Sequence, residues 1–223
     1  MNFFLNAALI GVPIARAVEE EHGCNVPWAI LMDPTSNCNL RCEGCWAGEY
    51  AKGAHLSLEE LDGIIQQGKE LGVYFYLYSG GEPLLRAADI IQLAEKHNDA
   101  VFCSFTNATL VTPELAAQLA EVGNVALAIS VEGFAEANDF RRGIGVYEKT
   151  ARAMDLLREV GAPFGFSTCY HAGNTEEVAS EEFVDAMIEK GCLFGWYFTY
   201  MPIGQHARPE LLVTPEQRQL MYE

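Results

Sequence analysis

The run SNCNLRCEGCW, residues 36–46, places Cys38, Cys42 and Cys45 on one short stretch of chain. Three thiolates on one loop can hold three irons of a cubane iron-sulfur cluster, and the fourth iron then stays open to a substrate or cofactor. The spacing therefore indicates an iron-sulfur site with chemistry at its open position.

Two other interpretations of the triplet remain open at this point. A structural zinc ion can also draw cysteines from one loop, but zinc needs four ligands. Neither Cys24 nor His55 lies at the spacing that zinc ribbons and fingers use for their second ligand pair. The remaining interpretation is a set of reduced, inert thiols.

The run YSGGEPL, residues 78–84, directly follows the apolar stretch 73–77 and precedes a helical pattern. Two adjacent glycines, Gly80 and Gly81, permit positive φ and let a ligand approach the backbone closely. An ordinary strand-to-helix turn, with Pro83 starting the helix, would have the same composition. This motif is informative only beside the cysteine loop.

In this order and spacing, the two motifs resemble those of the radical S-adenosylmethionine (radical SAM) enzymes, and the resemblance covers essentially the whole chain. It is greatest to the subgroup that contains molybdopterin, peptide-maturation and heme-related enzymes. The resemblance implies a 4Fe-4S cluster held by Cys38, Cys42 and Cys45. It implies that the open iron takes the amino and carboxylate groups of S-adenosylmethionine, and that the amino group is held by Gly80, Gly81 and Glu82.

One position departs from the family pattern. The family usually carries an aromatic residue immediately before the third cysteine, where this chain has Gly44, and Trp46 follows that cysteine instead. The contact with adenine that the resemblance assigns to the aromatic ring therefore has no counterpart at Gly44.

Polar residues at two further predicted strand ends match family motifs. Ser130 and Glu132 alternate along a strand, which puts them on one face. The resemblance implies that they bind the ribose hydroxyls, and a solvent-facing loop carboxylate is the alternative for Glu132. Asn107 matches the family's Thr-Asn-Gly turn with Ala108 in place of glycine, and a purely structural turn is equally consistent.

Arg142 matches the Asp-x-x-Arg-Gly segment of related enzymes. Its guanidinium would clamp the cofactor carboxylate bidentately, although pairing with Asp139 at the surface is the competing interpretation. The predicted cofactor-binding set is Gly80, Gly81, Glu82, Asn107, Ser130, Glu132 and Arg142.

Apolar strand-like runs alternate with amphipathic helical patterns, which is typical of βα units and a parallel sheet. Strands are expected at residues 28–33, 73–79, 100–106, 125–131, 163–169 and 193–201. Helices are expected at residues 57–71, 87–97, 112–122, 147–160 and 176–190. A sixth helix should begin at Thr214, an N-cap followed by Pro215 and the capping-box residue Gln217, and the sequence should stop inside it at Glu223.

Six such units predict an α/β fold, the partial (β/α)6 barrel of the radical SAM core, over residues 28–223, preceded by an N-terminal helical extension over residues 1–27. Barrel enzymes place their sites at the carboxyl ends of the strands. Half of the 223 residues are apolar, enough for one sizeable core.

The formal charge of -17 argues against a nucleic-acid substrate, because phosphate backbones demand clustered Lys and Arg. Seven cysteines, an odd number without a regular framework, favour reduced thiols in the cytoplasm. No stretch is long and apolar enough to be a transmembrane segment.

The resemblance thus implies a cytoplasmic iron-sulfur oxidoreductase that cleaves S-adenosylmethionine reductively. The resulting 5'-deoxyadenosyl radical would take hydrogen from an unidentified small-molecule or peptide substrate. A reductase, ferredoxin or flavodoxin would supply the electron. The alternative is a non-catalytic metal-binding module in which the triplet holds zinc or a structural cluster. No catalytic residue beyond the cofactor site is predicted.

Overall fold

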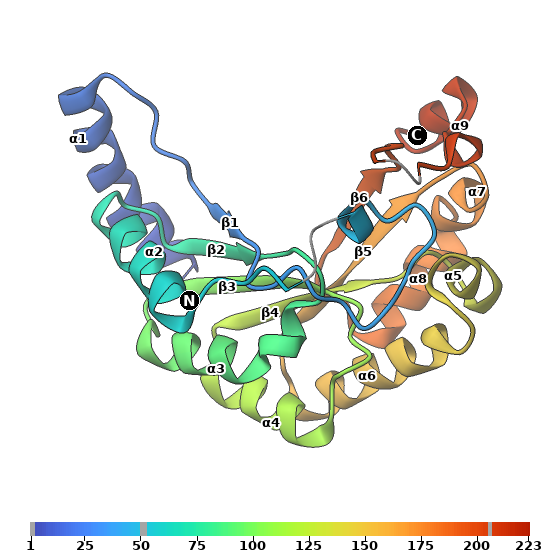
Figure 1. Ribbon diagram of the computed structural model, residues 1–223, viewed down its shortest axis with the longest axis horizontal. Helices are drawn as coiled ribbons and strands as arrows, with labels where there is room; N and C mark the ends of the chain where they lie inside the picture. The colour runs from blue at the N-terminus through green and yellow to red at the C-terminus, as the bar shows by residue number, and fades with distance from the viewer. Residues whose placement is uncertain (1–2, 50–52, 205–206) are drawn as a thin grey trace.

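A computed structural model describes residues 3–49, 53–204 and 207–223. Its centre is a six-stranded parallel sheet in which the spatial order of the strands follows their order in the chain. The strands are β1 (Ile30–Met32), β2 (Phe75–Tyr78), β3 (Val101–Thr106), β4 (Val125–Ser130), β5 (Phe164–Tyr170) and β6 (Gly195–Thr199). The sheet curls into a half-barrel, which confirms the predicted partial (β/α)6 barrel (Figure 1).

Helices cover the convex face of this sheet, and the opposite side stays open between α1 (Val12–His22) and α9 (Pro215–Leu220) (Figure 1). The helices between the strands are α2 (Leu58–Glu70), α3 (Ala87–Lys96), α4 (Pro113–Val122), α5 (Ala135–Arg142), α6 (Val146–Val160), α7 (Thr175–Val178) and α8 (Glu181–Lys190). Short 3-10 turns η2 (Trp46–Glu49) and η3 (Pro83–Arg86) follow the cysteine loop and the glycine motif.

Three helix predictions need correction. The expected helix 176–190 is two helices, because the Ser180 hydroxyl accepts a hydrogen bond from the Phe183 N–H and starts α8 anew. The pattern did not predict α5, which is short and mostly polar. The last helix, α9 (Pro215–Leu220), begins at the predicted Thr214 cap but ends before the last three residues, so the sequence does not stop inside it.

Before β1, the chain forms a π-helical segment η1 (Phe3–Gly11) and α1 (Val12–His22). The Asn6 side chain ties this part to the body by donating to the Asp99 carbonyl at 2.5 Å. The division of the chain at residue 27 stays a prediction. In the part of the chain that the structure describes, no helix is long and apolar enough to cross a membrane.

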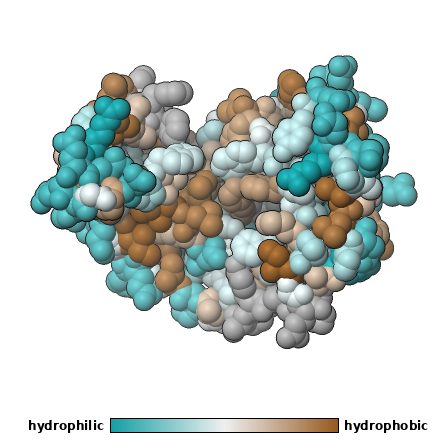
Figure 2. Space-filling view, turned by 90° about the horizontal axis from the view of Figure 1, so that it is seen from above, coloured by the Kyte–Doolittle hydropathy of each residue, from teal (hydrophilic) through white to brown (hydrophobic). Residues whose placement is uncertain are grey.

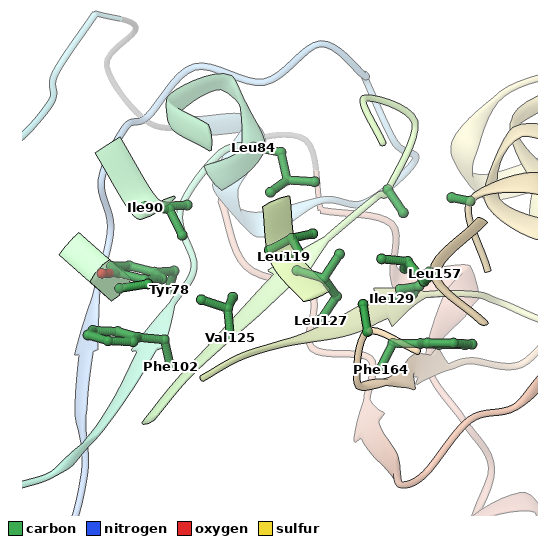
Figure 3. Packing of buried hydrophobic residues seen from close by; sticks show 14 of the residues in the cluster. Tyr78, Leu84, Ile90, Phe102, Leu119, Val125, Leu127, Ile129, Leu157 and Phe164 are labelled. Carbon is green, nitrogen blue, oxygen red and sulfur yellow. The ribbon is translucent and has the colours of Figure 1, made fainter. Parts of the chain in front are cut away.

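The main core lies between the sheet and the helices. Alternate strand residues point to this side, and the fully buried ones include Tyr78, Phe102, Leu127, Ile129 and Phe164 (Figure 3). Each such aromatic or aliphatic side chain contributes roughly 1.5–3 kcal/mol when fully buried.

The inner face of the half-barrel changes character along the strands. Part of it is apolar, with a cluster around Phe75 near the start of β2 and a stacked pair, Phe105 and Trp196, at 5.0 Å between ring centroids. Towards the carboxyl ends of β4 and β5 the same face carries Ser130 and Ser167, which pair in register. The polar end of the inner face is where a ligand can be bound.

Candidate active site

A cavity of about 1210 Å³ opens at the carboxyl ends of the strands. It is larger than the 300–1,000 Å³ typical of sites for one small molecule. Seen from above, the molecule is notched between two lobes, with apolar and polar residues mixed over the central part (Figure 2). The walls of the cavity include residues from both motif loops and from every strand end.

Cys38, Cys42 and Cys45 all line this cavity, on the loop between β1 and α2. The loop is compact: the Cys45 N–H donates to the Cys42 carbonyl at 3.2 Å, and the Leu40 N–H approaches the Cys38 sulfur at 3.4 Å. All three are thiols and are partly exposed. Three thiols on one wall of a roomy cavity fit the donor set of a cubane cluster with one open iron.

The Gly80-Gly81 loop is locked against the cysteine loop by backbone hydrogen bonds. The Gly81 N–H donates to the Thr35 carbonyl at 2.9 Å, and the Glu82 N–H donates to the Asn37 carbonyl at 2.7 Å. A Cβ atom on Gly81 would lie 2.0 Å from the Asn37 oxygen, and one on Gly80 would lie 2.7 Å from the Thr35 oxygen. Both glycines line the cavity, but close contact between the two loops already requires them.

Glu82 also lines the cavity, although it is only 1% exposed. Its Oε1 accepts from the Thr106 hydroxyl at 2.6 Å and the Leu84 N–H at 2.9 Å, and its Oε2 accepts from the Asn107 N–H at 2.8 Å. Burial raises the pKa of Glu82, and these three hydrogen bonds oppose the rise. Because these three donors are uncharged, an ionised Glu82 is a buried negative charge suited to a cationic group.

Asn107 lines the cavity and also ties β3 to the cysteine loop. Its Nδ2 donates to Asn39 Oδ1 at 2.8 Å, while its own Oδ1 accepts from the Thr109 N–H at 2.9 Å. Ala108 keeps the left-handed conformation expected of the family's glycine, with φ of +57°. Asn107 therefore makes the contacts of a structural turn residue and also lies on the cavity wall.

Ser130 and Glu132 do not share the cavity wall as the sequence suggested. Ser130 lines the cavity, whereas Glu132 is 0% exposed and lies behind the wall. Its Oε1 accepts from Arg141 Nη1 at 2.5 Å and from Arg142 Nε and Nη2 at 2.9 and 2.5 Å, and its Oε2 accepts from the Cys169 N–H at 3.0 Å. Burial would raise the pKa of Glu132, but the two guanidiniums lower it overall.

The two arginines end the unpredicted helix α5 and line the cavity. Arg142 donates through Nε and Nη2 to Glu132, so the bidentate edge predicted for the cofactor carboxylate is occupied by a protein carboxylate. The alternative pairing with Asp139 is not formed either, because Asp139 accepts from the N–H groups of Gly145 and Tyr147.

Arg141 connects this ion-pair group to the cysteine loop. Its carbonyl accepts from the Glu43 N–H at 2.8 Å, between the second and third cysteines. Burial raises the pKa of the Cys42 thiol, and the positive charges of Arg142 and Arg141 oppose the rise. The Cys42 thiol therefore lies within reach of the positive charge of both arginines.

At Gly44, where the family pattern has an aromatic residue, the ring of Tyr200 packs against the backbone. A Cβ atom on Gly44 would lie 2.7 Å from the Tyr200 ring, and Tyr200 is 2% exposed and lines the cavity. Trp46 also lines the cavity, with 45% exposure. Aromatic side chains are thus available near this position from the residue after β6 and from η2.

The sequence reasoning missed Arg141, which pairs with Glu132 and anchors the cysteine loop. The signal available was the Arg-Arg pair nine and ten residues after a strand-end glutamate. It also left Ser167, Cys169 and Thr199 unassigned, although all three line the cavity at strand ends. Among residues 3–49, 53–204 and 207–223, no three His, Cys, Asp or Glu side chains group closely enough to hold a single metal ion.

Comparison with known proteins agrees with the resemblance that the two motif loops show. The family model for the radical SAM superfamily matches residues 32–186. An AdoMet-dependent heme synthase of Methanosarcina barkeri is 30% identical over 81% of this chain and 53% of its own length. The mycofactocin maturase MftC of Mycolicibacterium smegmatis is 29% identical over 95% of this chain and 55% of its own length.

Solved structures agree on the fold. The structure of Streptococcus suis SuiB bound to S-adenosylmethionine superposes with a TM-score of 0.77 at 21% identity, covering 92% of this chain and 48% of that one. The chain thus spans about half the length of the relatives it matches. The matched family model covers more than half of the chain, including both motif loops, and the chain is a member of the radical SAM superfamily.

Proposed function

We propose that Cys38, Cys42 and Cys45 bind a 4Fe-4S cluster and that the cavity beside them binds S-adenosylmethionine. The observation that carries the proposal is the contact between the two motif loops, which puts three thiols and Glu82 on one cavity wall. When bound and reduced by one electron, the cluster and S-adenosylmethionine supply methionine and a 5'-deoxyadenosyl radical that takes hydrogen from a substrate.

The protein contributes binding and orientation. Glu82, with Gly80 and Gly81, holds the amino group, because its buried carboxylate is hydrogen-bonded only to uncharged donors among the described residues, with Arg142 as a more distant positive charge, and attracts an ammonium group. Ser130 reaches a ribose hydroxyl from the end of β4.

Asn107, Arg142 and Glu132 complete the proposed set. Asn107 keeps the cysteine loop in register. Arg142 presents positive charge to the cofactor carboxylate while Glu132 holds it in place from behind the wall.

Substrate, electron donor and location remain part of this proposal. Relatives are named for heme synthesis and for mycofactocin maturation, and one solved SuiB structure contains a precursor peptide. A small molecule or a peptide therefore suits the space left beside the cofactor in a cavity of about 1210 Å³. A reductase, ferredoxin or flavodoxin would deliver the electron, and an oxygen-sensitive cluster suits the cytoplasm.

Anaerobic reconstitution tests the proposal directly. The wild type should bind iron and sulfide and form 5'-deoxyadenosine from S-adenosylmethionine under reductant. Alanine at any one of Cys38, Cys42 and Cys45 should abolish both, because an iron without its thiolate is labile. Cys24→Ala, an exposed cysteine outside the loop, should change neither. A colourless, zinc-loaded protein after anaerobic purification would instead favour the non-catalytic metal-binding module.

A further inference from the structure

Cys169 lies at the carboxyl end of β5 and lines the same cavity as the cysteine loop. Strand alternation puts it on the inner face with Ser167, and in the sheet it pairs with Phe198 of β6. The structure describes all seven cysteines, and Cys24, Cys103 and Cys192 lie away from this cavity. Cys169 is therefore the thiol that a cavity ligand meets outside the cluster loop.

The surroundings of Cys169 keep it protonated and fixed. Burial raises the pKa of its thiol to about 11, although the nearby Arg141 opposes the rise. Its backbone N–H donates to Glu132 Oε2 at 3.0 Å, which attaches this strand end to the buried ion-pair group. Metal ligation requires a thiolate. A protonated S–H group on this anchored strand end instead carries a hydrogen atom that can be transferred.

Arg141, on the same wall, has a hydrogen-bond donor that the described residues leave without an acceptor. It is 6% exposed and lines the cavity, and its Nη1 donates to Glu132. Its Nε has no acceptor among the residues that the structure describes. A buried donor without an acceptor is uncommon and suits a ligand that brings one. The wall thus offers an anchor for an acceptor group beside a thiol.

We propose that Cys169 returns a hydrogen atom to the substrate radical, an inference that rests on the proposed function. The radical carbon takes the hydrogen from Sγ, so a C–H bond forms, the S–H bond breaks and sulfur is left as a thiyl radical. One electron from the low-potential electron carrier and one proton from solvent then restore the thiol. An S–H bond is weaker than an ordinary alkyl C–H bond, so transfer to an unstabilised alkyl radical is favourable. The substrate leaves at its original oxidation level.

Heavy water tests, without a known substrate, whether the Cys169 thiol can give its hydrogen atom to a carbon radical in the cavity. The Cys169 thiol exchanges to S–D, whereas C–H bonds of the protein do not exchange. During reductive cleavage without substrate, the 5'-deoxyadenosyl radical takes hydrogen from the weakest bond within reach. Mass spectrometry should find deuterium in 5'-deoxyadenosine from the wild type and from Cys103→Ala, a buried control. The deuterium should be lost with Cys169→Ala and with Cys169→Ser.

A second readout is independent of turnover. In the reconstituted protein at alkaline pH, N-ethylmaleimide should label Cys169, and S-adenosylhomocysteine should suppress that labelling while the exposed Cys24 still reacts. Undiminished deuterium in both Cys169 variants, or labelling that the nucleoside does not suppress, overturns the inference and leaves the proposed function intact. Absence of 5'-deoxyadenosine from every protein, the wild type included, overturns the proposed function itself.

Discussion

Two buried glutamates, Glu82 after β2 and Glu132 after β4, are stabilised in different ways, and we call the strand ends around each of them the two halves of the cavity rim. Glu82 accepts hydrogen bonds from two backbone N–H groups and one hydroxyl. Glu132 accepts from two guanidiniums and one backbone N–H. Burial raises the pKa of Glu82, whereas for Glu132 the arginines overcome the effect of burial and lower it.

This difference gives the two halves of the rim different roles. The negative charge of Glu82 has no cation bonded to it within the described chain and faces the cavity, so it can attract a cationic group of a ligand. The charge of Glu132, which lies behind the wall, is already matched by Arg141 and Arg142 on the wall. One half of the rim is suited to binding and the other to holding the arginines and the strand ends in place.

Gly81→Ala should have the largest effect, because it breaks the half of the rim that carries Glu82. The added Cβ would lie 2.0 Å from the carbonyl oxygen of Asn37, next to Cys38, and the two loops must separate. We expect iron content after anaerobic reconstitution to fall to that of a cysteine-to-alanine variant.

Gly63→Ala in α2 is the matched control, since its new Cβ would meet nothing closer than 3.9 Å. It should retain iron and gain about 0.5–1 kcal/mol of helix stability. Full iron loading of Gly81→Ala would show that contact between the loops is not needed for the site.

Glu132→Gln should disrupt the half of the rim around Glu132, and its effect should be a loss of folding stability. The substitution removes the negative charge that both Arg141 and Arg142 pair with, and both arginine side chains are almost fully buried. Removal of one partner from a buried pair costs about 3–5 kcal/mol. Urea unfolding of the purified variant measures this loss.

Asp155→Asn provides the comparison for Glu132→Gln, because the Lys190–Asp155 pair at 2.8 Å is exposed. An exposed pair contributes only about 0–1 kcal/mol, so this variant should unfold close to the wild type. Equal stability losses in both variants would mean that the burial of the Glu132 group has no energetic consequence.

Glu82→Gln should act on ligand affinity. The amide keeps an acceptor for Thr106 and Leu84 but removes the charge, which we expect to weaken S-adenosylmethionine binding by about 1.5–3 kcal/mol, or roughly 10- to 150-fold in Kd. Calorimetry on the reconstituted protein gives the value, with Glu121→Gln on the exposed side of α4 as control. Unchanged affinity at full iron content would place Glu82 outside the cofactor site.

The sequence predicted the Glu82 half of the rim better than the Glu132 half, for a physical reason. The two motif loops are contiguous runs that follow β1 and β2 directly, so their residues and the six-stranded order could be read from local patterns. The ion-pair group depends on α5, a short polar helix without a periodic apolar face, folding back onto the end of β4. Alternation placed Glu132 beside Ser130, but the chain has left the strand after Ser130 and alternation no longer holds there.

The smallest and sharpest test is the dependence of stability on pH, where the two glutamates should have opposite signs. The lowered pKa of Glu132 means that its stabilisation is present above the unfolded value, about 4.3, and is lost as pH falls through its lower folded pKa. The raised pKa of Glu82 means that the folded protein binds the extra proton, so stability is lost as pH rises from about 4.3 through the folded pKa.

The measurement is the unfolding free energy of the wild type minus that of each glutamine variant, as a function of pH. This difference should decrease in acid for Glu132→Gln and increase in acid for Glu82→Gln. Each unit of pKa shift corresponds to about 1.36 kcal/mol, and effects of acid on the rest of the protein cancel in the difference. Differences of the same sign would show that the two carboxylates are stabilised alike, and the division of the rim into a binding half and a holding half would fail.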